Sequence, residues 1–172
     1  MISIAQLEAQ LQYFDGKHVD SLFRVARTLP AESSTIDQLM SLAERSDPPM
    51  QIAATWLLKY LQSHKLSFTP LQVNRLIEHL RGSGPWESRL QVMQMLPDLV
   101  IPAESTETLF GLLVSALAGR NKFIHAWAYN GLHSLASQHR DYVNEVAPLL
   151  EEALEDEAAS VRARVRQLKP LR

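Results

Sequence analysis

The sequence predicts an all-α protein of about ten helices arranged as five antiparallel pairs. Three observations lead to this fold class. Apolar residues recur with a helical period along nearly the whole chain, helix-breaking residues separate these runs, and no stretch alternates apolar and polar residues as a strand would. With 172 residues, 46% of them hydrophobic and 21% charged, the chain has the composition of a globular protein that can bury its own core.

The first helix of each pair is predicted from its apolar face. Ile4, Leu7 and Leu11 are spaced so that their side chains share one side of a helix, and similar faces recur further along the chain. The five first helices are expected over residues 3–15, 34–47, 70–82, 103–118 and 142–157. A hydroxyl that precedes such a run can accept a hydrogen bond from a free backbone N–H, which predicts helix caps at Ser34, Thr69 and Ser105.

The second helices repeat a common pattern at regular spacing. They are expected over residues 17–30, 50–65, 86–99, 120–140 and 158–172. Their first buried residues are predicted to be Val19, Met50, Trp86, Ile124 and Val161, which are 31, 36, 38 and 37 residues apart. The residues four and seven positions further on, Phe23 and Gly131 among them, are all apolar or glycine.

A period of this length with two helices per unit is typical of a right-handed α-solenoid, or α-α superhelix, in which each pair covers the apolar side of the preceding pair. We therefore expect residues 1–172 to form one domain of five approximate repeats, at 1–33, 34–69, 70–102, 103–141 and 142–172. A non-repetitive helical bundle of the same size is the alternative.

Two segments resemble a known repeat family. Asp47-Pro-Pro-Met-Gln-Ile-Ala-Ala and Asp156-Glu-Ala-Ala-Ser-Val-Arg-Ala are similar to the turn and second-helix opening of HEAT repeats, where an Asp precedes a helix that begins with a Val-Arg pair. The first and third repeats depart from this motif, because Val19 lacks the preceding Asp-Pro and Pro97 interrupts a second helix. The resemblance implies a HEAT-like architecture and leaves the function open.

Several classes of function receive no support from the sequence. The chain has no cysteine, which excludes disulfides, thiolate zinc sites and a cysteine nucleophile. No signal peptide is visible, and no apolar stretch approaches the 18 or so residues of a membrane span, so we expect a cytoplasmic protein that does not enter membranes. Neither a catalytic constellation nor a cofactor or metal motif is apparent, and we expect a protein that is not an enzyme.

The charged residues are divided unequally between the two kinds of helix. The predicted first helices contain 14 acidic and three basic residues, whereas the second helices contain 14 basic and four acidic ones if Asp141 is counted. Second helices usually line the concave side of HEAT-like proteins, so the resemblance implies a basic concave surface that would attract acidic partners. Simple pairing of opposite charges between neighbouring helices is the alternative.

The polar positions of the second helices provide the candidate binding residues. We predict that they contact another protein or an acidic peptide segment, with nucleic acid as the less favoured partner. The candidates are Arg24, Arg27, Lys59, His125, Tyr129, His133, Arg162, Arg166 and Lys169. His125 and His133 are two helical turns apart, about 12 Å along the axis, and cannot share a metal without a ligand from elsewhere.

An alternative function comes from the same resemblance. Some DNA glycosylases that act on alkylated bases are built from HEAT-like repeats and place aromatic rings and a carboxylate near the lesion. Here Trp86 or Tyr129 would have to supply the ring, and Glu87 or Asp20 the carboxylate. No local motif supports this match, and the three tryptophans of the chain are expected in the core, whereas stacking on a base needs an outward-facing ring.

Overall fold

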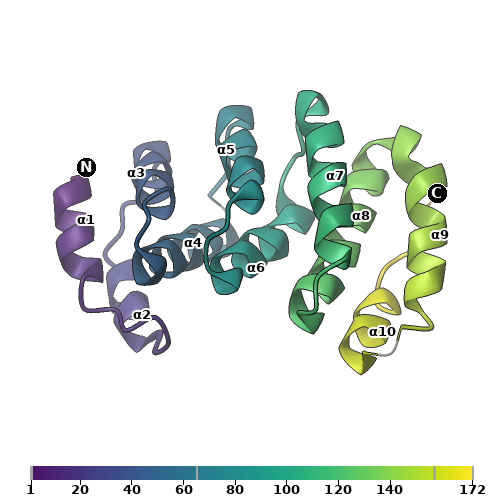
Figure 1. Cartoon of the computed structure of the whole chain (residues 1–172). Coiled ribbons are helices and arrows are strands. Elements are labelled where there is room, and N and C mark those ends of the chain that lie inside the picture. Colours follow the sequence, from purple (N-terminus) through teal and green to yellow (C-terminus); the bar gives the residue numbers. More distant parts are fainter. Residues whose placement is uncertain (1, 65, 157, 172) are drawn as a thin grey trace. The chain divides into compact units, whose positions relative to one another are not determined.

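All regular structure in the described part of the chain is helical. The computed structural model describes residues 2–64, 66–156 and 158–171, and these contain ten α-helices, three short 3-10 helices and no strand. The all-α prediction is confirmed (Figure 1). The first helices of the pairs are α1 (Ile4–Leu11), α3 (Ser33–Ala43), α5 (Pro70–Arg81), α7 (Thr106–Leu117) and α9 (Val143–Ala153). The second helices are α2 (Asp20–Ala26), α4 (Pro48–Ser63), α6 (Trp86–Met95), α8 (Lys122–Gln138) and α10 (Ala159–Val165).

The second helices of the first and last pairs are shorter than the sequence predicts. The helix predicted over 17–30 is α2 at Asp20–Ala26, because the preceding turn is held by side-chain bonds. The Asp15 carboxylate accepts from the backbone N–H groups of Lys17 and His18, at 2.9 and 2.8 Å, and Gly16 takes a positive φ of 82°. The helix predicted over 158–172 is α10, which ends at Val165.

The helix caps agree only in part with prediction. Thr69 caps α5 with a complete capping box, in which its hydroxyl accepts from the N–H of Gln72 and the Gln72 side chain accepts from the N–H of Thr69. Ser105 precedes α7, but its side chain makes no cap bond there. The prediction for Ser34 is wrong, because α3 already begins at Ser33.

The chain consists of two compact units, Met1–Met95 and Leu96–Arg172. In the first unit, α1, α3 and α5 contact one another in sequence and form one layer, and α2, α4 and α6 form the other (Figure 1). In the second unit, α8 is the central helix and contacts α7, α9 and α10. Gly131 of α8 allows a close approach, since a Cβ atom there would lie 2.9 Å from Leu96 and 3.0 Å from Leu113.

The predicted core positions of the second helices are all buried in the second and fourth repeats and only partly buried in the other three. The expected positions of α4 and α8 are buried, as are Val161 and Val165 of α10. Val19, Leu90 and Leu168, which were also expected in the core, are only half-buried. Phe23, however, is 42% exposed and Trp86 is 38% exposed. Helix α2 buries the expected Ala26 together with Leu22 and Val25, so its buried side is rotated away from Phe23. Trp86 is the first residue of α6, and the buried residues of that helix begin at Ser88.

Candidate functional site

Four rings form an aromatic row on the second helices of the first unit. Trp56, Tyr60 and His64 follow one another at intervals of four residues along one side of α4. The Trp56 and Tyr60 rings stack with centroids 5.6 Å apart, and the Tyr60 and His64 rings stack at 4.0 Å. Phe23 of α2 meets Trp56 edge to face at 4.8 Å. We call Phe23, Trp56, Tyr60 and His64 the aromatic row; Phe23 and His64 are exposed, and the two rings between them are half-buried.

Two arginines accompany this row. Arg27, the C-cap residue of α2, follows Phe23 by one helical turn and lies on the same side of the helix, and Arg24 lies about 100° around the helix from Phe23. Both side chains are exposed, and neither forms an ion pair with any residue that the structure describes. The surface therefore combines exposed aromatic area with unneutralised positive charge, and these are the residue types that proteins use at binding interfaces.

The aromatic row was missed by the reasoning from sequence, although its spacing was visible. The sequence pattern predicts Trp56 in the core and Phe23 at a buried repeat position. The signal that could have found the row is the recurrence of Trp56, Tyr60 and His64 every four residues on one predicted helix. Its exposure depends on the rotation of α2, which periodicity alone does not determine.

Lys59, the third predicted binding residue of the first unit, is engaged within the fold. Its Nζ donates a hydrogen bond to Oε1 of Gln94 at 2.6 Å, and burial lowers the pKa of its amine. Lys59 therefore contributes to the contact between α4 and α6, and its charge is less available to a partner than those of Arg24 and Arg27.

The predicted residues of the second unit fall into two groups. Tyr129 is buried, with 9% of its surface exposed, and burial together with nearby Asp156 and Glu152 raises the pKa of its hydroxyl. The other five are at least partly accessible: three lie on α8 or α10, and Arg166 and Lys169 follow the end of α10. His125 is half-buried, the His133 Nε2 forms a 2.7 Å hydrogen bond with the backbone oxygen of Lys169, and Arg162 donates to the backbone oxygen of Asp156.

Arg166 and Lys169 border an apolar groove between α9 and α10. The groove has a volume of about 510 Å³, and we call it the C-terminal groove. Apolar residues from both helices line it, together with Glu151 on the side of α9 and Arg166 and Lys169 on the side of α10. On the α9 side the apolar lining residues are Val143, Ala147, Leu150 and Leu154. The structure thus brings these two predicted cations to an open apolar surface.

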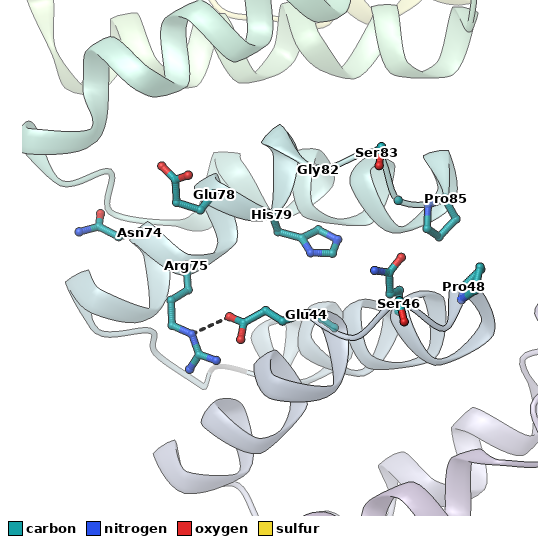
Figure 2. A pocket seen from close by; sticks show the side chains of 13 residues that line it. Glu44, Ser46, Pro48, Asn74, Arg75, Glu78, His79, Gly82, Ser83 and Pro85 are labelled. Atoms are coloured by element: carbon teal, nitrogen blue, oxygen red, sulfur yellow. Dashed lines mark hydrogen bonds and ion pairs between the residues drawn. The ribbon is translucent and has the colours of Figure 1, made fainter.

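A larger cleft lies in the first unit, and the charged side chains that line it form ion pairs. It has a volume of about 750 Å³ and is bordered by the ends of α3 and α5, the start of α4 and the turn at Gly82–Pro85 (Figure 2). Arg75 and Glu44 point toward one another across it, with 2.9 Å between Nε and Oε1, and Glu78 is paired with Arg81. Because these charges already satisfy one another, the cleft offers little free charge to a ligand.

His79 in this cleft is hydrogen-bonded to a serine hydroxyl that is too buried to act as a nucleophile. Its Nε2 lies 2.6 Å from Oγ of Ser88, but Ser88 is fully buried and also lies within 3.3 Å of the Thr55 hydroxyl. Burial lowers the pKa of His79 and favours its neutral form. A substrate cannot reach a buried hydroxyl, so this arrangement joins α4, α5 and α6 and does not resemble a catalytic pair.

Comparisons with known proteins identify a fold relative and no family. No family model matches the chain, and no curated protein is similar to it. A solved structure of an engineered protein from a structural genomics consortium has a TM-score of 0.64 and 17% sequence identity, over 96% of this chain and 77% of the other. At that identity the similarity extends to the fold alone. None of the helices in the described part of the chain is long and apolar enough to cross a membrane.

Proposed function

We propose that this chain is a HEAT-like right-handed α-solenoid that binds another protein through its second helices and has no enzymatic activity of its own. The repeat is supported by the hydrogen bonds between successive pairs. In the first unit Gln72 donates to Asp37 over a separation of 35 residues, and in the second unit Gln138 donates to the backbone of Leu99 over 39. Nearly constant separations are expected where each unit contacts only the next one.

The single observation that carries the binding proposal is the aromatic row. Phe23 is 42% exposed, and its ring meets the stacked rings of the neighbouring helix edge to face. Large exposed aromatic side chains that cluster on one surface are typical of protein interaction sites. They provide a rigid apolar contact area with little loss of side-chain entropy on binding.

Arg24 and Arg27 indicate the chemistry of the partner. Both cations are exposed near the C-terminal end of α2, and neither has a carboxylate partner in the described residues. A partner segment with acidic side chains next to an apolar or aromatic anchor would satisfy both parts of this surface. The proposed partner is therefore an acidic peptide segment of another protein.

Nucleic-acid binding remains the second candidate because Trp86 is 38% exposed, as an outward-facing ring must be to stack on a base. Two observations favour the protein partner. Tyr129, one of the rings that a glycosylase-like site would need, is buried. The rings of Trp56, Tyr60 and His64 cover one another's faces, which leaves less free ring surface for bases.

The experiment begins with co-purification of the tagged protein from its native cells and identification of the bound protein by mass spectrometry. The affinity for the bound segment is then measured by fluorescence anisotropy for wild type, Phe23→Ala/Tyr60→Ala and Arg24→Glu/Arg27→Glu. We expect each double variant to weaken binding by about tenfold or more, because aromatic and arginine side chains dominate interface energetics.

A matched control distinguishes loss of the binding surface from a general effect of net charge. Arg120→Glu/Lys122→Glu changes the charge by the same amount at exposed residues of the second unit and should leave the affinity unchanged. Equal affinity for wild type and the aromatic-row variant would contradict the proposed site. A shift of duplex DNA that weakens steeply with salt would instead support the nucleic-acid alternative.

A further inference from the structure

The inter-helix contacts of α3 define which side of a first helix receives the next pair. Ser33 and Asp37 of α3 accept hydrogen bonds from Gln72 of α5, at 3.0 and 2.8 Å. Ser41 and Glu44 continue this side of the helix, and both are hydrogen-bonded to Arg75 of α5. Four residues of α3 therefore mark the surface on which α5 is seated.

The equivalent side of α9 lines the C-terminal groove. Helices α3 and α9 are both 11 residues long and begin at Ser33 and Val143, so residues 110 apart occupy equivalent positions. The four α3 positions that contact α5 correspond to Val143, Ala147, Glu151 and Leu154, and all four line the groove. In α9 this side is mainly apolar, whereas in α3 it is polar and hydrogen-bonded to α5. Helix α9 packs on α8 and α10, and this side of it stays open.

The two walls of the groove carry opposite charges that are available to an occupant. Arg166 and Lys169 are exposed on the α10 side, and Glu151 is exposed on the α9 side. None of the three forms an ion pair with another residue in the described parts of the chain. An apolar floor between a basic wall and an acidic wall favours a rod with an apolar stripe and charged flanks, which is the form of an amphipathic helix.

We propose that the C-terminal groove binds an amphipathic helix of a partner protein in the position that α5 occupies on α3. The apolar stripe of this helix packs on Ala147, Leu150 and Leu154. Its acidic flank faces Arg166 and Lys169, and its opposite flank carries a basic residue against Glu151. The site is distinct from the aromatic row, which belongs to the other unit, so either proposal can fail without the other.

The test uses a synthetic probe in place of the unidentified partner. The probe is a fluorescein-labelled peptide of about 18 residues, or five helical turns, with a leucine stripe, glutamates along one flank and lysines along the other. Its affinity for the full chain is measured by fluorescence anisotropy. We expect Leu154→Gln and Arg166→Glu/Lys169→Glu to weaken binding by about tenfold each, from lost apolar contact and from charge repulsion.

Leu154 is 36% exposed and both cations are exposed, so these substitutions should leave the helical circular dichroism of the protein unchanged. The control Arg120→Glu/Lys122→Glu alters net charge by the same amount at exposed residues that do not line the groove, and it should bind the probe as wild type does. The proposal is overturned if this control loses as much affinity as the groove variants, or if wild type does not bind the probe. It is also overturned if light scattering shows a dimer that Leu154→Gln dissociates, because a second copy would then occupy the groove.

Discussion

The imidazole of His79 lies between α5 and α6, where its Nε2 is 2.6 Å from the Ser88 hydroxyl. Burial lowers the pKa of this histidine below its ordinary value of 6.5, with a smaller contribution from the positive charge of Arg89, while Glu44 acts in the opposite direction. In the pH range between the lowered pKa and about 6.5, the unfolded chain binds a proton at this residue and the folded chain does not. The free energy of unfolding must therefore decrease as the pH falls through that range.

We predict that His79→Gln reduces this dependence on pH, because glutamine can still bond to Ser88 but does not titrate. Urea unfolding would be measured at about pH 7.5 and about pH 5, on either side of the ordinary histidine range. Wild type should lose more stability than the variant between the two values. His18, whose pKa is raised by its hydrogen bond to Asp15, has the opposite effect, but it is present in both proteins. An equal loss in both proteins would show that His79 is not held in its neutral form.

Single residues also show what the sequence could and could not predict. Thr69 was identified as a cap because a hydroxyl precedes the apolar run of α5, and Gln72 completes the capping box. The cap predicted at Ser34 is wrong because Ser33, Ser34 and Thr35 can all cap a helix. The pattern does not show at which of them the helix begins. Phe23 and Trp86 were placed in the core since apolarity alone does not report which side of a short helix faces its neighbour.

At the scale of helices, the positions of the ten helices in the described residues were predictable because apolar residues recur with a helical period between helix-breaking residues. The candidate binding surfaces could be predicted only in part from apolar periodicity. Arg166 and Lys169 were predicted as binding residues from their repeat positions, but the apolar groove beside them depends on which side of α9 stays uncovered. That is a tertiary property, and Val143, Ala147 and Leu154 look like ordinary core residues in the sequence.

The packing of α7 against α8 gives a prediction at the same scale. A Cβ at Gly131 would meet Leu96 at 2.9 Å and Leu113 at 3.0 and 3.1 Å, and both leucines are fully buried. We predict that Gly131→Ala destabilises the protein by about 1–3 kcal/mol through overpacking. Gly111 of α7 is the matched control, because it lies within a helix and a Cβ there meets nothing within 4 Å. Gly111→Ala should stabilise by about 0.5–1 kcal/mol, and urea unfolding would measure both changes.

Comparing these two variants tests whether the space around Gly131 is too small for a methyl group. Alanine favours the helix at either position, so any difference between the two variants reflects the space around the added methyl group. If Gly131→Ala were as stable as Gly111→Ala, the close approach of α8 to Leu96 and Leu113 would be contradicted.

For the whole molecule, the proposed solenoid predicts that stability is distributed locally, as its two compact units and the spacing of its inter-helix hydrogen bonds suggest. In a stack of repeats each pair gains its stabilisation from its own core and from its immediate neighbours. A destabilised pair should therefore open without opening distant ones, and amide hydrogen exchange measures such local opening segment by segment.

We predict that Gly131→Ala accelerates amide exchange in α7 and α8, whose contact it strains, and leaves α3 and α4 at their wild-type rates. Mass spectrometry of peptic fragments would resolve these segments, with Gly111→Ala as the control in which no helix exchanges faster. A uniform increase along the chain would instead mean that the protein opens only by unfolding as one body, as a single-domain bundle does. The pattern of exchange thus distinguishes the proposed solenoid from the non-repetitive bundle that the sequence alone left as an alternative.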